Sequence, residues 1–560
     1  MNLLNEKKRN NTPLIEVRSV SFSYDAKNTG RALHRVSFFV SRGERVAILG
    51  HNGSGKSTLS KIMGGILDPS EGECLINGKN IKAMDFRELR GTVGMVFQDP
   101  ENQIVAAMVE DDTAFAPENQ GLPPDEIQLR VDVALAEADM THKRDSSVAA
   151  LSGGEKQRLA LAGVLAANVE CLILDEPTAM LDPSGRMKVQ KVLRSLHAEN
   201  MTIVEITHQI EEESFTDIQR VIVMEKGSLK WQGRTNEFWD KAEELGFALP
   251  DWMRVKRYCD AHGINIPNGI KDFRPAPSQK EAEQIPGGVK FRIDGLSFRY
   301  LAENYALRNV DAEIYAGEWL SVIGRSGSGK STLVQHLNAL NKIQEGHIYF
   351  DGGELPQKGE EVRTLRQKVG LVFQHPEDQL FSPTVKDELA FAPKNAGFKG
   401  KALDDAVIFG LECAGLSRDF LGRNPIALSG GERRLVAIAS VLSAKPEVIV
   451  LDEPLAGLDA SYQRRILGML SKLRDEGRTV ITVTHDLSTA LKYSDRILVL
   501  DRSNSVKEGS PHEILGSIME LLEPETWPDI MRVSARIRIA IPKFPLLYDY
   551  EEFTECISQI

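Results

Sequence analysis

The stretch that decides the fold is GHNGSGKS at residues 50–57, and the chain carries it a second time as GRSGSGKS at residues 324–331. Each copy follows a short apolar run and precedes a helix-compatible segment, so each lies where a buried strand would turn into a helix. A phosphate-binding loop requires that context. Its glycines let backbone N–H groups turn inward, and the helix N-terminus adds partial positive charge. Two copies in matching context predict two phosphate loops rather than an accidental glycine-rich turn.

The side chains of the two loops predict a bound nucleotide with its metal ion. Lys56 and Lys330 are placed to reach the β- and γ-phosphates, and the hydroxyls of Ser57 and Ser331 are placed to hold Mg²⁺. We therefore expect ATP and Mg²⁺ as cofactors. The predicted ATP-binding residues of the loops are Gly50, Asn52, Gly53, Gly55, Lys56, Ser57 and Thr58, and Gly324, Ser326, Gly327, Gly329, Lys330, Ser331 and Thr332.

Composition excludes several classes of protein. The chain has 560 residues, 42% of them hydrophobic and 26% charged, which is typical of a globular protein in water. Its net charge of −12 argues against binding nucleic acid through an overall basic surface. Five scattered cysteines without a CxxC pair predict reduced thiols rather than metal sites or disulfides. No apolar run reaches the roughly 18 residues of a membrane span, so we expect any membrane role to work through a partner.

The second half of the sequence repeats the first about 275 residues later. Small differences in spacing between the copies indicate short loop insertions. Two similar domains are therefore expected, and we place the parts of the chain at residues 1–13 (N-terminal extension), 14–233 (first domain), 234–288 (helical segment and linker), 289–515 (second domain) and 516–560 (C-terminal extension).

Two residues at strand ends repeat around each loop. Tyr24 and Tyr300 close alternating, strand-like runs ahead of the loops, and their repetition favours stacking on a nucleotide base. Gln98 and Gln374 end apolar strands and precede a Pro-containing loop. We expect each glutamine to contact Mg²⁺ and the attacking water. Between these residues, the turn-rich stretch at 68–80 predicts short antiparallel hairpins.

The sequence LSGGE occurs at residues 151–155 and again at 428–432. Ser152 and Ser429 are placed as helix N-caps, and two glycines after each serine leave backbone donors exposed at the helix start. Each half already has its own phosphate loop, so the expected ligand of this second terminus is the nucleotide of the other half. The predicted residues are Ser152, Gly153, Gly154, Ser429, Gly430 and Gly431.

Acidic pairs follow buried-type strands in CLILDEP and VIVLDEP. Asp175 and Asp452 are expected to support Mg²⁺, and the next residues, Glu176 and Glu453, are expected to polarise a water for attack on the γ-phosphate. A later strand in each half ends in a histidine, and the order of the motifs favours γ-phosphate contact. These histidines are His208 and His485.

With these motifs in the same order twice, the chain resembles the nucleotide-binding domains of ABC ATPases. The resemblance implies an α/β fold in which each domain has a mostly parallel sheet core, an antiparallel β subdomain and a helical subdomain. It also implies head-to-tail packing, with one ATPase site from Lys56 and Ser429 and another from Lys330 and Ser152. Asp182 and Asp459 match the interface loop of that family.

The stretches QDPENQIVAAMVEDDTAFAPENQG (98–121) and QHPEDQLFSPTVKDELAFAPKNAG (374–397) are similar to the ATPases of energy-coupling-factor transporters. This resemblance implies a vitamin or metal importer, in which the ATPases clamp a transmembrane scaffold subunit and a separate membrane subunit captures the substrate. It places the chain at the cytoplasmic face of the membrane through those partners, and it leaves thiamine precursors, other vitamins and cobalt or nickel open as substrates.

Two other classes compete with the importer. A soluble two-domain ABC ATPase that acts on ribosomes is disfavoured because residues 234–288 are nearly neutral, where a basic hairpin for rRNA is expected. DNA-repair ATPases are disfavoured because no long heptad insertion interrupts either half. The apolar pattern after residue 514 fits both strand and helix, and these post-domain segments are equally compatible with a dimer contact and with a helical cap on the preceding domain.

Overall fold

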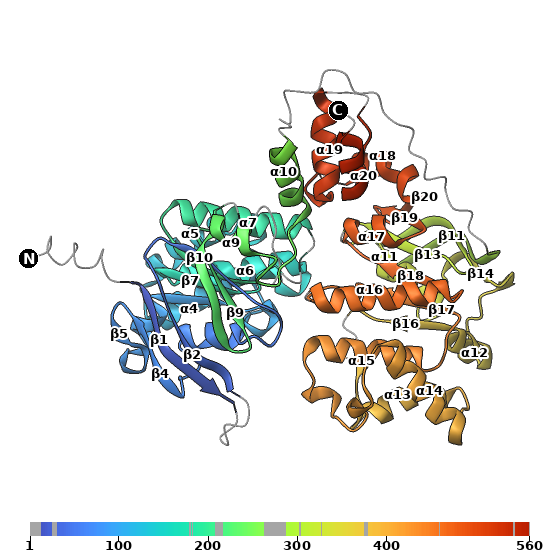
Figure 1. Ribbon diagram of the computed structural model, residues 1–560, viewed down its shortest axis with the longest axis horizontal. Helices are drawn as coiled ribbons and strands as arrows, with labels where there is room; N and C mark the ends of the chain where they lie inside the picture. The colour runs from blue at the N-terminus through green and yellow to red at the C-terminus, as the bar shows by residue number, and fades with distance from the viewer. Residues whose placement is uncertain are drawn as a thin grey trace, which may run out of the picture. The chain divides into compact units, whose positions relative to one another are not determined.

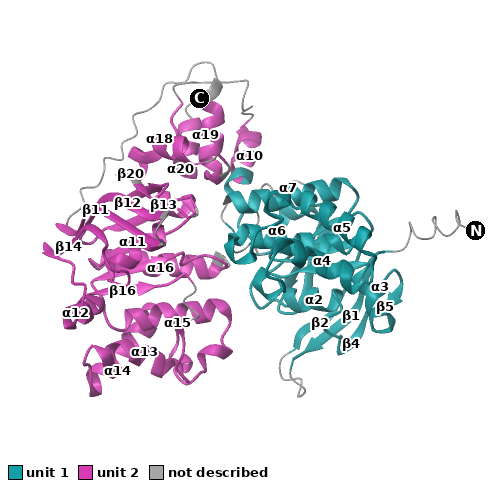
Figure 2. Ribbon diagram, turned by 180° about the vertical axis from the view of Figure 1, so that it is seen from behind, with its two compact units in different colours: residues 1–253 teal, residues 254–560 magenta. Residues whose placement is uncertain are grey.

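The computed structural model of the chain describes residues 13–24, 31–178, 181, 183–207, 215, 217–262, 287–301, 304–325, 327–374, 379–458, 460–522, 524–540 and 544–558. The chain forms two compact units, Met1–Met253 and Arg254–Ile560, which are coloured separately in Figure 2. Each unit contains one copy of the repeated motifs.

The first unit alternates strands and helices (Figure 1). Its elements are β1 (Ile15–Ser23), β2 (Arg31–Val40), β3 (Arg45–Leu49), α2 (Lys56–Met63), β4 (Glu71–Ile76), β5 (Lys79–Asn80), α3 (Phe86–Arg90), β6 (Val93–Val96), α4 (Val109–Asn119), α5 (Pro124–Glu137), α6 (Gly153–Ala166), β7 (Cys171–Asp175), α7 (Pro183–Ala198), β8 (Thr202–Thr207), β9 (Arg220–Glu225), β10 (Ser228–Arg234) and α9 (Thr235–Lys241), followed by α10 (Asp251–His262), which crosses the boundary between the units.

The second unit repeats this order. Its elements are β11 (Val289–Leu301), β12 (Asn304–Tyr315), β13 (Trp319–Gly324), α11 (Lys330–Leu337), β14 (Glu345–Phe350), β15 (Gly353–Glu354), α12 (Glu360–Lys368), β16 (Val369–Val372), α13 (Val385–Asn395), α14 (Gly400–Cys413), α15 (Gly430–Leu442), β17 (Val448–Asp452), α16 (Ala460–Asp475), β18 (Thr479–Val483), α17 (Leu487–Tyr493), β19 (Arg496–Asp501), β20 (Asn504–Gly509), α18 (Pro511–Leu521), α19 (Asp529–Ala540) and α20 (Tyr550–Ser558).

A parallel sheet forms the centre of each unit. Its strand order is β10-β9-β3-β8-β7-β6 in the first unit and β16-β17-β18-β13-β19-β20 in the second, and within the described parts of these two sheets only the edge strands β10 and β20 pair antiparallel. The central strands β3 and β13 are buried along their whole length, as expected where both faces of a parallel sheet are covered. In the first unit, Ile48 lies opposite Ile206 on one side and Ile222 on the other.

Side chains of alternate residues on β7 enter two different cores. Leu172 and Leu174 pack in the cluster that contains the helices α4, α5 and α6, whereas Cys171 and Ile173 pack in the cluster beneath the antiparallel sheet. That antiparallel sheet has the order β2-β1-β4-β5, and the second unit repeats it as β12-β11-β14-β15. Figure 1 shows α13, α14 and α15 gathered as the corresponding helical group of the second unit. The predicted α/β class, with a parallel core, an antiparallel sheet and a helical group in each half, is confirmed.

In each unit, the segment that follows the parallel sheet packs a helix against that sheet. In the first unit, Phe238 and Trp239 of α9 pack with Leu49 and Val223 of the sheet. In the second, Ile514 and Ile518 of α18 do the same against Ile323 and Val499. The sequence left the structure of the C-terminal extension open between strand and helix, and its described residues form α19 and α20.

A second helical cluster joins residues that are far apart in the sequence. Within the second unit, Val255 and Cys259 of α10 pack against Ile530 and Ile537 of α19 and Phe553 of α20. The residues that follow the first half of the chain therefore share a core with the end of the chain.

We expect Phe238→Ala to destabilise the first unit by about 3–5 kcal/mol, because Phe238 is fully buried and its ring contacts those of Phe215, Trp231, Trp239 and Phe247. Chemical denaturation followed by tryptophan fluorescence measures the change. Phe86→Ala is the control, since that ring is 68% exposed and its removal should change stability little. Equal effects of the two substitutions would contradict the aromatic core.

Candidate functional site

The phosphate loop of each unit turns between a buried strand and a helix. In the first unit it joins β3 to α2, and Gly55 at the turn has a φ of 92°. A Cβ at Gly55 would lie 2.6 Å from the carbonyl oxygen of Ala32, so only glycine fits there. The ammonium of Lys56 lies inside the loop, where it donates to the carbonyl oxygens of Gly50 at 2.7 Å and His51 at 3.0 Å.

The second loop repeats this geometry between β13 and α11. Gly329 has a φ of 95°, and Lys330 donates to the carbonyl oxygens of Gly324 and Arg325, both at 2.9 Å. Both lysines are buried by their own loops. The predicted residue Ser326 lies outside the described residues.

The predicted base-stacking tyrosines stand beside the helices that follow the loops. Tyr24 and Tyr300 are 65% and 61% exposed. The hydroxyl of Tyr24 lies 3.1 Å from that of Thr58, and the hydroxyl of Tyr300 lies 3.3 Å from that of Thr332. Each ring is held edge-on by the phenylalanine two residues before it, which leaves a face open. The geometry is compatible with stacking on a base, which stays a prediction.

The acidic residue at the end of β7 offers oxygen ligands for a hard cation. Asp175 is buried, and its Oδ1 accepts a 3.1 Å hydrogen bond from the hydroxyl of Ser57. Burial raises the pKa of the Asp175 carboxyl above its ordinary value, and the neighbouring Glu176 charge acts in the same direction. The serine hydrogen bonds and the Lys56 ammonium lower this pKa but do not outweigh burial. A buried carboxylate beside a hydroxyl oxygen fits Mg²⁺, which prefers such oxygen ligands.

The expected catalytic glutamates share an unusual backbone. Glu176 and Glu453 have φ values of 51° and 48°, in the left-handed region that non-glycine residues rarely adopt. Their N–H groups donate to the carbonyl oxygens of Ile206 at 2.9 Å and Val483 at 3.0 Å, which holds both in this conformation. Strain of this kind collects at functional sites, and here it is repeated at the same position of both halves.

Each of these glutamates meets another predicted site residue. In the first, the amide of Gln98 donates to Glu176 at 3.1 Å, so the structure brings two predicted site residues together. In the second, Nδ1 of His485 lies 2.9 Å from a carboxylate oxygen of Glu453, and Gln374 is exposed. His208 of the first unit, and Asp182 and Asp459, lie outside the described residues.

The LSGGE serines cap helices as predicted. Ser152 and Ser429 each form a capping box with the glutamate three residues later, Glu155 and Glu432. Burial raises the pKa of the Glu155 carboxyl, but hydrogen bonds from Ser152 and Lys143 outweigh burial and lower it to about 2. Both serines are exposed, and a Cβ at the next glycine would meet nothing within 4 Å. The donors of these helix ends are therefore open to a ligand.

In each unit, one buried carboxylate that the sequence analysis missed holds the loop after the glutamine. Asp112 of α4 accepts from the N–H groups of Val105 at 2.7 Å and Ala106 at 3.0 Å. Glu388 of α13 accepts from those of Phe381 at 3.1 Å and Ser382 at 2.8 Å. Both acids lie in clusters of acidic letters, VEDD and VKDE, from which the sequence alone does not select the buried member.

The post-domain segments also contact the phosphate loops, which the sequence did not predict. The imidazole of His51 stacks on Phe247 with a centroid distance of 5.7 Å and an interplanar angle of 7°. At the matching place in the second unit, the Arg325 guanidinium donates to the carbonyl oxygen of Leu521 at 3.0 Å, across 196 residues of sequence. Each half therefore supports its phosphate loop from the segment that follows its sheet.

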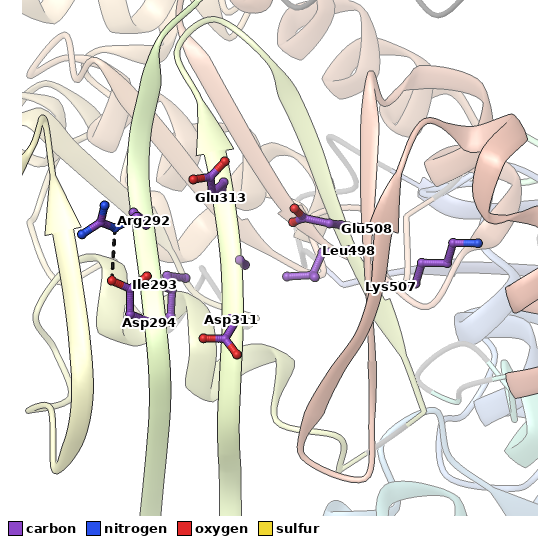
Figure 3. A pocket seen from close by; sticks show the side chains of 9 residues that line it. Arg292, Ile293, Asp294, Asp311, Glu313, Leu498, Lys507 and Glu508 are labelled. Atoms are coloured by element: carbon purple, nitrogen blue, oxygen red, sulfur yellow. Dashed lines mark ion pairs between the residues drawn. The ribbon is translucent and has the colours of Figure 1, made fainter.

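An open groove of about 390 Å³ lies on the second unit between β11, β12 and β20 (Figure 3). Its charged side chains are partnered locally: Arg292 pairs with Asp294 at 3.1 Å, and Glu508 pairs with Arg496 at 3.0 Å. None of the predicted nucleotide residues lines this groove, so it is separate from the phosphate loop.

Two further features are absent from the residues that the structure describes. No group of three or more His, Cys, Asp or Glu side chains is placed to hold a metal ion there. In the same ranges, every helix is too short or too polar to cross a membrane.

Comparison with known proteins gives a family match in both halves. The model described as "ABC transporter" matches residues 33–179 and 307–456, and a model for an AAA domain matches residues 422–491. A Methanosarcina acetivorans protein is 31% identical over 97% of this chain and 94% of its own length, and one from Methanosarcina mazei is 33% identical over 91% of each. Both carry the name of candidate ABC transporter ATP-binding proteins. The structure of cbiO1 from Clostridium perfringens, described as part of the ABC transporter complex cbiONQ, is 29% identical and covers 46% of this chain and 96% of that one, with a TM-score of 0.39.

Lys56→Ala should weaken nucleotide binding at one of two sites by at least about tenfold, because it removes the charge that the first loop directs at the phosphates. Equilibrium binding of a fluorescent ATP analogue to the full chain should then show one strong site instead of two. Lys61→Ala, a change of the same kind on the same helix α2, is the control. Two unchanged sites in Lys56→Ala would show that the phosphates lie elsewhere.

Proposed function

The chain belongs to the ABC transporter family of ATP-binding proteins, as an ABC ATPase with two nucleotide-binding domains in tandem, and from that premise we propose that it is the energy-coupling component of a membrane importer of the energy-coupling-factor type. The observation that carries the proposal is the pair of loops after the strand-end glutamines. Each is held by a buried carboxylate and presents apolar side chains to the outside.

Exposed apolar side chains of these loops and of the helices that follow them, α4 and α13, form what we call the two coupling patches. In the first unit the patch consists of Val105, Met108 and Phe115, and in the second it consists of Phe381 and Phe391, whose rings meet edge to face at 4.8 Å. Val105 and Phe381 are 62% and 65% exposed, at matching positions. Exposed apolar groups that are held rigidly in both copies support docking of a protein partner. We propose that the partner is the transmembrane scaffold subunit, which holds the chain at the cytoplasmic face of the membrane.

The nucleotide chemistry follows from the site residues. Lys56 and Lys330 would hold the phosphates of ATP, and Tyr24 or Tyr300 its base. Ser57 with Asp175, or Ser331 with Asp452, would hold Mg²⁺, which when bound would supply positive charge against the phosphates. Glu176 and Glu453 accept a proton from the attacking water, and Gln98, Gln374, His208 and His485 orient the water and the γ-phosphate.

Each site is completed by the signature helix of the other domain. The exposed helix ends at Ser152 and Ser429 carry open backbone donors, and each domain already has its own phosphate loop. We propose that Ser429, Gly430 and Gly431 contact the ATP on the first loop, and that Ser152, Gly153 and Gly154 contact the ATP on the second. For Asp182 and Asp459, which lie outside the described residues, we propose the role in the interface loop that the resemblance implies. ATP then closes the two domains and hydrolysis opens them, which moves the scaffold.

The transported substrate is a vitamin, a vitamin precursor or a transition metal ion, and a separate membrane subunit captures it. Affinity purification of the full chain in mild detergent tests the proposal. We expect two kinds of polytopic membrane protein to copurify, a scaffold and a smaller capture subunit. Recovery of ribosomes without any polytopic membrane protein would overturn the importer and support the ribosomal alternative.

Asp112→Ala combined with Glu388→Ala should release both loops and lower recovery of the membrane partner by about tenfold or more, because each carboxylate satisfies two backbone donors. ATP binding to the purified chain should change little, since neither acid lies in a phosphate loop. The exposed neighbour offers the control Asp111→Ala, which should leave recovery unchanged. Full recovery of the membrane partner with the double variant would show that the two loops do not mediate docking.

Glu176→Gln and Glu453→Gln in one chain should reduce ATP hydrolysis by about 10² or more while ATP binding stays nearly intact, because an amide cannot accept the proton of the attacking water. Phosphate release and nucleotide affinity, measured on the same preparation, separate the two effects. Hydrolysis at the wild-type rate would remove both glutamates from this role.

A further inference from the structure

The two sites differ in the side chain that lies behind the metal-binding carboxylate. In the first unit, the hydroxyl of Ser60 lies 3.1 Å from Oδ2 of Asp175, and it also lies 2.8 Å from the carbonyl oxygen of Ser57. Ser57 and Ser60 are one turn apart on α2, so both hydroxyls face the end of β7. The two oxygens of Asp175 are therefore each bonded to a different serine, Oδ1 to Ser57 and Oδ2 to Ser60.

The second unit has no hydroxyl at the matching position. Four residues after the loop lysine, Ser60 in GKSTLSK is replaced by Val334 in GKSTLVQ. Val334 is fully buried on α11 and packs in the core of its unit, as Ser60 is fully buried on α2. Asp452 is buried at the end of β17. A valine can pack against a carboxylate but cannot donate to it.

Resting on the proposed function, we propose that Ser60 is a positioning residue for the metal ion at the first phosphate loop. The hydroxyl fixes the plane of the Asp175 carboxylate, so that Oδ1 is turned toward Ser57 before the ion arrives.

The size of the effect follows from how such partners act in metal sites. Hydrogen bonds from residues behind a metal ligand set its orientation, and their loss typically lowers metal affinity about 10–100-fold. A hydroxyl inside a helix normally bonds only the carbonyl oxygen one turn earlier. At Ser60 the same hydroxyl lies within hydrogen-bond distance of both that carbonyl and the carboxylate, and a charge-assisted hydrogen bond to the carboxylate is the contact that would orient a metal ligand.

The test measures binding of Mn²⁺, as a probe for Mg²⁺, to the full chain by electron paramagnetic resonance with a non-hydrolysable ATP analogue. Lys330→Ala weakens analogue binding at the second loop, so an analogue concentration that fills only the intact loop reads the first site alone, and Lys56→Ala does the converse. In the first background we compare Ser60 with Ser60→Ala. In the second we compare Val334 with the isosteric change Val334→Thr and with Val334→Ala, which shortens the side chain without adding a donor.

We expect Ser60→Ala to weaken Mn²⁺ binding about tenfold while affinity for the analogue in EDTA stays the same, which a merely structural role would not produce. Val334→Thr should tighten Mn²⁺ binding at the second site, and Val334→Ala should not. Mn²⁺ affinity within twofold of the parent in Ser60→Ala, or equal effects of Val334→Thr and Val334→Ala, would overturn the role of Ser60. A parent chain that binds no Mn²⁺ beside the analogue would overturn the metal site of the proposed function as well.

Discussion

The structure depends on the turn from a buried strand into a helix around one lysine ammonium in each half. Carbonyl oxygens of Gly50 and His51 surround Lys56, and this is possible because glycines before it adopt a left-handed backbone. The remaining site residues then follow from the parallel sheet, since the carboxyl ends of its strands all meet at the edge where the loop lies. Asp175, Glu176 and Gln98 reach that edge from β7 and β6.

At matching positions, the two halves make equivalent supporting contacts with different side chains. The loop after the glutamine is held by an aspartate in one half and by a glutamate in the other, and the phosphate loop is supported by ring stacking in one and by a guanidinium in the other. Both halves have a glutamate with a left-handed backbone at the same position, Glu176 and Glu453. Matching positions of the two halves therefore hold the same backbone geometry with different side chains.

Much of this could be read from the sequence, because the motifs are local and their order is repeated. The α/β class, the loop lysines and the capping serines each depend on a few consecutive residues. The contacts that sequence reasoning missed depend on packing. Asp112 differs from the exposed Asp111 only in which face of α4 it occupies. Phe247 and His51 lie far apart in the sequence and meet only in the folded chain. Ser60 is identified as a site residue only by its distance to Asp175.

The central claim is that each ATP site is shared between the two domains, and paired substitutions test it most directly. In a chain that also carries Glu176→Gln and Glu453→Gln, nucleotides retained after rapid desalting are counted. Lys56→Ala with Ser429→Arg damages a single shared site, so one ATP should be retained. Lys56→Ala with Ser152→Arg damages both sites, so none should be retained. The reverse pattern would contradict the account, because it would place each signature serine at the phosphate loop of its own domain.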